Sequence, residues 1–321
     1  MEHHILIPLD GSVLAECVLP HVAAIAKAFE SRLTLLHVLE SGPGGNQNQV
    51  TDPLEWQIKK AQATAYLDAK AAQLRAIFPA VETLLVEGQS AEKIIEIANE
   101  QQADLIALSS HGQSGLSEWN VSSIVQKIIL RSKKSIFLVR AYQPIKETIE
   151  AFRYQRLAVP LDSSMRAEII LPVAVKLAGF FQAQLLLTHV IHRPEITCDE
   201  PPSQDDLALI NKLVERNQEK AEHYFEKLRS MLTVQGVQLE THVRVDTDIT
   251  YCLHDFIERE HADLVLLAAH GYSGNPKWPY GSVTTSFIIH GSTTLLIVQD
   301  LPPEEMQQTQ AEIAAREYKG H

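Results

Sequence analysis

The chain has 321 residues, of which 45% are hydrophobic, and this size is enough for about two globular domains with cores of their own. A formal net charge of −12 argues against a general nucleic-acid binder, which needs clustered Lys and Arg, and against contact with anionic membranes. Its cysteines, Cys17, Cys198 and Cys252, lie far apart without a CxxC pair, which is typical of small packed residues in a reducing compartment.

The N-terminus enters an apolar segment almost at once. No basic and apolar signal peptide precedes that segment, and no apolar run reaches the roughly 18 residues of a membrane-spanning helix. The sequence therefore predicts a cytoplasmic protein.

The first half alternates strand-like and helix-like segments. Apolar runs predict strands at 4–9, 32–39, 81–88, 103–110 and 135–140, and amphipathic runs predict helices at 14–29, 53–78, 90–102 and 122–132. Pro20 bends the first helix or marks its late start, and Ser90 is the expected N-cap of the third. The near-continuous apolarity of the strands suits a parallel sheet covered on both faces.

The second half repeats the first. ILIPLDGS (5–12) aligns with LAVPLDSS (157–164), and ADLIALSSHG (103–112) aligns with ADLVLLAAHG (262–271). One unit of roughly 140 residues is therefore used twice. We predict two Rossmann-like, doubly wound α/β domains, each with a mostly parallel five-stranded sheet flanked by helices, related by pseudo-two-fold symmetry. They span 1–142 and 153–300, and a polar tail follows at 301–321.

A loop rich in Gly and Pro, HGYSGNPKWPYGSVTT (270–285), joins a buried strand to a helix in the second half. Gly271 and Gly281 permit close approach of a ligand, and a helix N-terminus after Gly281 offers the N–H groups that bind phosphate. The hydroxyls of Ser282 and Thr284 are further candidate donors. The alternative is that Gly271 only caps the strand and Ser282 only caps the helix, and the local spacing does not choose between the two.

The Asp in PLD, the HV that closes the second strand, and HG followed by nine residues and GS resemble the universal stress protein family over nearly all of both repeats. Nucleotide-binding members carry Gly-x-x-Gly, nine residues, then Gly-Ser or Gly-Thr. The resemblance implies that the second repeat binds ATP or ADP, with Mg²⁺ held through the phosphates. The implied nucleotide-binding residues are Pro160, Asp162, Val190, Ala268, Gly271, Gly281, Ser282, Val283 and Thr284.

In this comparison Asp162 hydrogen-bonds the base or ribose, Val190 meets adenine with its backbone, and Ala268 takes the place of the first Gly. The first repeat departs further, because Ser122 and Ser123 replace Gly-Ser. A Cβ at position 122 intrudes on the phosphates or forbids the backbone angle that the site needs. The corresponding weaker site comprises Pro8, Asp10, Val38, Ser109, Gly112, Ser122 and Ser123.

Other residues have simpler interpretations. Histidines recur at matching positions, His37 with His189 and His111 with His270, without zinc-type spacing, and we predict that they bond loop carbonyls. We predict no catalytic residue and no metal held by the protein. Asp10 and Asp162 are expected to bind ligand or to cap a loop, and Trp119 and Trp278 to pack their loops or line a pocket mouth.

Three functions stay open. The first is a cytoplasmic stress-response protein that binds ATP or ADP mainly in the second domain, as a sensor or regulator with at most slow hydrolysis, since no arginine finger is evident. The second is a tandem scaffold that binds no nucleotide and acts through unknown protein partners. The third, a nucleotidyl transferase, is disfavoured because the second loop contains a single lysine, Lys277. The resemblance also implies an internal pseudo-dimer formed by strands 135–139 and 294–298, and a further homodimer stays open.

Overall fold

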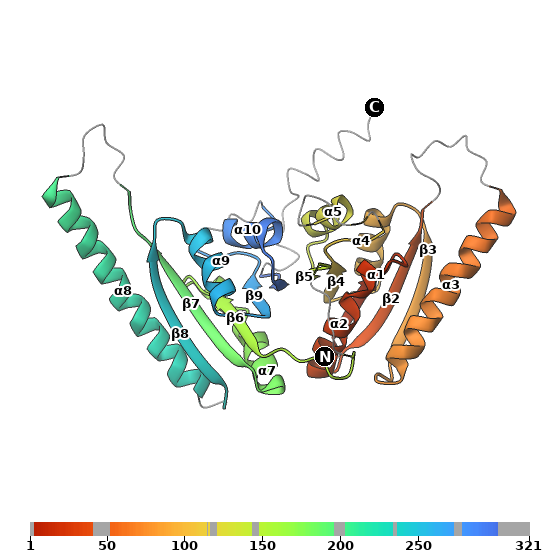
Figure 1. Ribbon diagram of the computed structural model, residues 1–321, viewed down its shortest axis with the longest axis horizontal. Helices are drawn as coiled ribbons and strands as arrows, with labels where there is room; N and C mark the ends of the chain where they lie inside the picture. Colours follow the sequence, from red (N-terminus) through yellow and green to blue (C-terminus); the bar gives the residue numbers. More distant parts are fainter. Residues whose placement is uncertain are drawn as a thin grey trace. The chain divides into compact units, whose positions relative to one another are not determined.

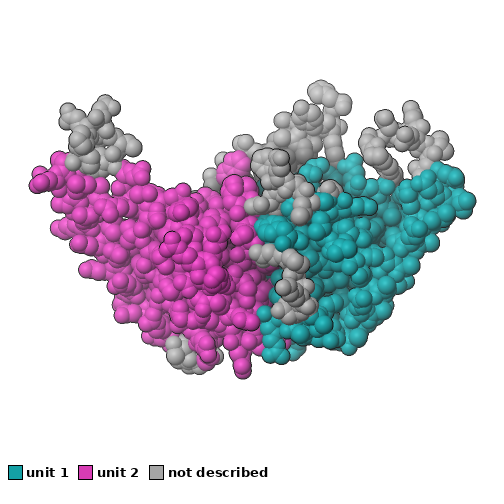
Figure 2. Space-filling view, in the orientation of Figure 1, with its two compact units in different colours: residues 1–153, 301–321 teal, residues 154–300 magenta. Residues whose placement is uncertain are grey.

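The computed structural model describes residues 3–40, 52–113, 115, 121–142, 148–195, 203–233, 236–272 and 278–300. These residues form two compact units (Figures 1 and 2). Unit 1 comprises residues 1–153 and 301–321, and unit 2 spans Tyr154–Asp300. Among the residues named above, Cys198, Trp119, Lys277 and the tail at 301–321 lie outside the described ranges.

Unit 1 contains a parallel sheet with the strand order β3-β2-β1-β4-β5. Its strands are β1 (His4–Pro8), β2 (Arg32–Leu39), β3 (Val81–Glu87), β4 (Leu105–Ser109) and β5 (Ser135–Val139). Its helices are α1 (Val13–Glu16), α2 (Val18–Phe29), α3 (Pro53–Arg75), α4 (Ser90–Glu100) and α5 (Ser123–Arg131).

Unit 2 repeats this arrangement with the strand order β10-β9-β6-β7-β8, again parallel. Its strands are β6 (Arg156–Pro160), β7 (Gln184–His192), β8 (Gln238–Asp246), β9 (Leu264–Ala268) and β10 (Thr294–Val298). Its helices are α6 (Met165–Glu168), α7 (Leu171–Phe181), α8 (Gln204–Thr233), α9 (Ile249–Arg259) and α10 (Ser282–His290). The predicted fold, two Rossmann-like units with five-stranded sheets, is confirmed.

The strand order places a topological switch point in each unit. β1 lies between β2 and β4, and β6 lies between β7 and β9. The chain therefore continues from β1 to β2 and β3 on one side of β1 and then crosses to β4 on the other side, and unit 2 does the same around β6. Doubly wound sheets bind ligands outside the carboxyl ends of their strands at this point. A ligand of unit 2 is therefore expected at the carboxyl ends of β6 and β9.

The structure differs from the sequence-based prediction at the first helix and at the N-cap of α4. The first predicted helix is split at Cys17, and Pro20 stands in the first turn of α2, where a missing N–H removes no helical hydrogen bond. The predicted N-cap Ser90 is wrong: Gln89 is the N-cap and Ser90 is the first helical residue. The Ser90 N–H instead donates to Glu40 Oε1 at 2.8 Å, so a carboxylate fifty residues away in sequence satisfies this helix end.

The core of unit 1 contains a histidine in α2. His21 is 7% exposed, and its ring meets the ring of Phe152 edge-on at 4.5 Å between centroids. Burial lowers the pKa of His21 to about 3. The repeat places Val173 at the corresponding position of unit 2, so an apolar side chain fits this place in the fold.

This histidine makes unit 1 sensitive to acid. The unfolded chain protonates His21 near pH 6.5 whereas the folded chain does not, so stability is present above that pH and is lost as pH falls towards 3. By pH 5 the loss is about 2 kcal/mol. We expect His21→Val to flatten this slope, measured by urea unfolding between pH 7 and pH 5. An unchanged slope would show that His21 is not the group responsible.

Candidate functional site

Asp162 ties two loops together at the carboxyl end of β6. Its Oδ1 accepts from the backbone N–H of Ser164 at 3.0 Å and from the Ser164 hydroxyl at 2.6 Å. Its Oδ2 accepts from the N–H of Tyr272, in the loop after β9, at 2.5 Å. Ser164 in turn caps α6 by accepting from the Ala167 N–H. The carboxylate therefore holds the β6–α6 turn against the turn that follows β9.

The carboxylate explains the first glycine of the long loop. A Cβ on Gly271 would lie 2.2 Å from Asp162 Oδ2, far inside the contact distance. Bare backbone is thus required here by the protein's own side chain. Asp162 is nevertheless exposed, and Oδ2 accepts one bond from the described residues, which leaves it acceptor capacity for a ligand.

Unit 1 contains the same clamp. Asp10 Oδ1 accepts from the N–H and hydroxyl of Ser12, and Oδ2 accepts from the N–H of Gln113 at 2.6 Å. A Cβ on Gly112 would lie 2.1 Å from Asp10 Oδ2. The clamp is therefore common to both repeats and does not distinguish a binding unit from a vestigial one.

The second glycine, Gly281, is not required by a close contact. Gly281 is the N-cap of α10, with φ −71° and ψ 169°, an extended conformation that any residue adopts. A Cβ there would meet nothing closer than the Ala269 carbonyl oxygen at 3.7 Å. Gly281 has no side chain with which to cap α10. Neither geometry nor space within the described chain requires a glycine, and its consequence is a helix N-terminus that its own N-cap residue does not cap.

Ser122 occupies the corresponding place in unit 1. It has φ −69° and ψ 160°, and its hydroxyl accepts from the Val125 N–H at 3.3 Å. The expectation that a Cβ at position 122 forbids the required backbone angle is therefore wrong. The effect of Ser122 is on the N-terminus of the helix. Its side chain satisfies one of the first N–H groups of α5, whereas Gly281 has no side chain that could satisfy the corresponding group of α10.

Two of the predicted hydroxyls are already engaged. The Thr284 hydroxyl donates to the Ala268 carbonyl at 2.9 Å, and Thr284 is buried, so this hydroxyl is already engaged. Thr284 lies in the first turn of α10, where backbone N–H groups point to the helix end. In unit 1 the Ser109 hydroxyl contacts the carbonyls of Leu14 and His111, both at 2.7 Å. Ser282 and Ser123, the first residues of α10 and α5, are exposed.

The remaining predicted residues lie at the same end of the sheets. Pro160 ends β6 opposite Thr188, so Val190 belongs to the part of β7 that extends past β6 and pairs with β8. Pro8 and Val38 stand in the same relation in unit 1, where Pro8 pairs with Leu36. The Gly281 N–H donates to the Ala269 carbonyl at 2.8 Å, which fixes the start of α10 beside the end of β9.

The two recurring histidines of unit 2 bond loop atoms. In unit 1 the His111 Nδ1 instead contacts the Ser110 hydroxyl at 3.0 Å, and the His37 Nδ1 has no hydrogen-bond partner among the described residues. The Nδ1–H of His189 donates to the Leu161 carbonyl at 2.8 Å, and burial lowers the pKa of His189 against this bond. His270 contacts the Asp300 carboxylate and the Trp278 carbonyl, both at 2.7 Å. The bond to Trp278 anchors the far end of the long loop.

Asp300 carries a buried carboxylate whose role was not predicted from the sequence. Its side chain is 1% exposed and also contacts Arg166 Nε of α6 at 2.7 Å. The bonds from His270 and Arg166 outweigh burial and hold the pKa of Asp300 below its usual value. The repeat places Leu14 and Ala141 at the positions of Arg166 and Asp300, so recurrence marked His270 but not these two partners. The clamp serines did recur, as DGS and DSS.

Comparison with known proteins agrees with the repeat. The sequence profile of the universal stress protein family matches residues 1–140 and 153–299. The chain belongs to the universal stress protein family. Each curated relative matches about half of it, as a tandem arrangement of two universal stress protein domains requires.

Two relatives and one structure illustrate this. Universal stress protein MJ0577 of Methanocaldococcus jannaschii is 27% identical over 156 residues, covering 44% of this chain and 96% of that protein. Universal stress protein Sll1654 of Synechocystis is 31% identical over 139 residues, covering 42% of this chain and 83% of that protein. A universal stress protein structure from Archaeoglobus fulgidus covers 93% of this chain and 98% of its own, at 15% identity and a TM-score of 0.63, which shows the shared fold.

None of the helices in the described ranges of this tandem universal stress protein combines the length and the apolar character needed to cross a bilayer.

Proposed function

We propose that unit 2 binds an adenine nucleotide, ATP or ADP, with its phosphates at the N-terminus of α10. The observation that carries the proposal is the contrast between the two units: the Ser122 side chain caps α5, whereas Gly281 has no side chain with which to cap α10. Uncapped N–H groups together with the helix dipole favour an anion. The backbone N–H groups of Ser282, Val283 and Thr284 are the donors in this proposal.

The adenosine part lies on the other side of the switch point. Asp162 is exposed and retains acceptor capacity on Oδ2, which suits a ribose hydroxyl or a base amino group. Val190 lies in the part of β7 that extends beyond the end of β6, so its backbone has no partner in β6 and is the proposed contact for adenine. Mg²⁺ accompanies the phosphates in this proposal, because it binds nucleotides chiefly through phosphate oxygens and water.

The consequence for the whole protein is regulatory. In this proposal the bound nucleotide contacts the carboxyl ends of β6 and β9 and the N-terminus of α10. We propose that its binding alters how the protein interacts with its partners, and that hydrolysis is slow or absent. Unit 1 keeps the Asp10 clamp, but its helix end is capped by Ser122, so it is not proposed as a second nucleotide site.

Co-purification is the simplest test. Protein isolated without added nucleotide is denatured, and the supernatant is separated by anion-exchange chromatography. We expect an adenine nucleotide in stoichiometric amount, and its identity distinguishes ATP from ADP. Absence of nucleotide, together with no binding on addition of Mg-ATP, would contradict the proposal and favour the scaffold alternative.

Gly281→Ser gives a matched stability prediction. Ser122 shows that serine adopts this backbone conformation and caps the helix, so the substitution adds a cap to α10. We expect the free energy of unfolding of unit 2 to rise by a few tenths of a kcal/mol. Thermal unfolding of the nucleotide-free protein measures this change, and a large destabilisation would mean that Gly281 is needed by the fold.

A further inference from the structure

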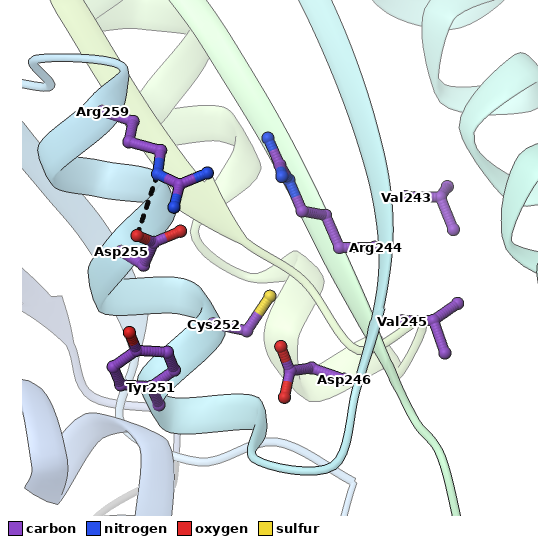
Figure 3. A pocket seen from close by; sticks show the side chains of 8 residues that line it. All are labelled: Val243, Arg244, Val245, Asp246, Tyr251, Cys252, Asp255 and Arg259. Carbon is purple, nitrogen blue, oxygen red and sulfur yellow. Dashed lines mark ion pairs between the residues drawn. The ribbon is translucent and has the colours of Figure 1, made fainter.

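A groove of about 450 Å³ lies between β8 and α9 and shares no residue with the proposed nucleotide site (Figure 3). Residues 243–246 of β8 line one side, and Cys252, Asp255 and Arg259 of α9 line the other. Figure 3 shows the side chains of Arg244 and Asp246 directed towards α9, whereas those of Val243 and Val245 point to the opposite face of the strand. The two valines therefore line the groove with their backbone.

The hydrogen-bond pattern agrees with this placement. The Arg193 N–H donates to the Asp246 carbonyl at 2.8 Å, so the backbone of Asp246 faces β7. Successive residues of a parallel ladder direct their backbone groups to opposite sides. Val243 and Val245 therefore direct N–H and C=O away from the sheet. Among the described residues β8 pairs with β7 alone, so these groups form a free strand edge.

The charges beside this edge alternate. The Arg244 guanidinium lies over the Phe256 ring at 5.4 Å from its centroid, and Asp246 Oδ1 accepts from the Asp248 N–H at 3.0 Å. Asp255 and Arg259 pair at 2.9 Å on the facing helix. A free edge beside balanced charges of both signs suits an extended polypeptide better than a small anion.

Unit 1 lacks these charges. Its register sets His37 opposite Leu85, as His189 stands opposite Val243, so Val86 and Gly88 hold the places of Arg244 and Asp246. The Lys93 side chain also packs against Gly88. The edge of β3 therefore has a free backbone without the charge pattern of β8.

We propose that β8 pairs in antiparallel orientation with β8 of a second copy of this chain, around a two-fold axis at Val245. This register sets Arg244 opposite Asp246 of the other copy twice, which gives two reciprocal ion pairs beside the exchanged backbone bonds. Centring the axis on Arg244 sets arginine opposite arginine, and centring it on Val243 sets Glu240 opposite Asp246. A register centred on His242 also sets opposite charges, Glu240 and Arg244, against each other, but it places Gln238 opposite Asp246. Asp246→Arg therefore separates the two registers, because it weakens association only when the axis lies at Val245.

The test is sedimentation velocity of the full chain from micromolar to sub-millimolar concentration. We expect reversible two-chain association in the wild type. Arg244→Asp or Asp246→Arg alone sets like charges opposite each other and weakens association about tenfold or more. The double variant R244D/D246R restores association, because it recreates the reciprocal pairs in reversed order.

Val245→Pro removes the central outward N–H without removing a bond to β7, and it also abolishes association. Leu85→Pro, which removes an outward N–H from the β3 edge of unit 1, is the matched control and leaves association intact. Circular dichroism and the thermal midpoint verify the fold of each variant. A wild type that stays a single chain throughout, or a dimer that survives Val245→Pro and both charge reversals, would overturn the proposal.

Discussion

Asp300→Ala is expected to lower the free energy of unfolding of unit 2 by about 3–5 kcal/mol, because it leaves the partners of a buried carboxylate without their countercharge. The Asp300 side chain is 1% exposed and bonds both His270, whose side chain is 0% exposed, and Arg166. The substitution also releases the anchor that His270 provides to the Trp278 carbonyl. Chemical denaturation at neutral pH measures the loss.

Asp255→Ala is the control for this prediction. Asp255 pairs with Arg259 at 2.9 Å on α9, but the Arg259 side chain is 68% exposed. Removing this pair is expected to cost less than about 1 kcal/mol. Equal losses in the two variants would show that burial of the Asp300 cluster adds nothing to the stability of unit 2.

Gly271→Ala is the second large effect. Its methyl group would lie 2.2 Å from Asp162 Oδ2, so the carboxylate must turn away and give up its bonds to Ser164 and Tyr272. We expect a loss of about 2–4 kcal/mol, since these bonds join a carboxylate to two backbone N–H donors and one hydroxyl donor. Gly281→Ala is the matched control, because a Cβ there has room, and it should change stability by less than about 0.5 kcal/mol.

A double-mutant cycle isolates the cause. Asp162→Ala removes the same bonds and also the atom that the methyl group meets. The double variant D162A/G271A should therefore be hardly less stable than either single variant, with a coupling of about 2 kcal/mol or more. Additive losses would mean that Gly271 is required for a reason other than its contact with Asp162.

Much of the fold could be predicted from the sequence because the same pattern of strands and helices occurs twice in the chain. Apolar runs of five to nine residues alternate with amphipathic helices, and the recurrence of PLD and HG at matching places identifies one structural unit. Local patterns were sufficient for strands and helices, since buried parallel strands impose near-continuous apolarity.

The details that could not be predicted from the sequence depend on contacts between residues that are far apart in the chain. Glu40 satisfies the Ser90 N–H across fifty positions, which no capping pattern within α4 reveals. Arg166 and Asp300 are 134 positions apart and have apolar counterparts, Leu14 and Ala141, in the first repeat. The two loop glycines looked equivalent in sequence. The structure separates them, because Gly271 accommodates Asp162 and Gly281 only leaves a helix end open.

The second glycine leads to the measurement that tests the account most directly: calorimetric titration of Mg-ATP into the wild type and Gly281→Ser. The serine variant keeps the fold, as Ser122 does in unit 1, but its hydroxyl occupies an N–H group at the start of α10. We predict binding to the wild type and a loss of about tenfold or more in affinity for the variant. Equal affinity in both proteins would contradict a phosphate site at the N-terminus of α10.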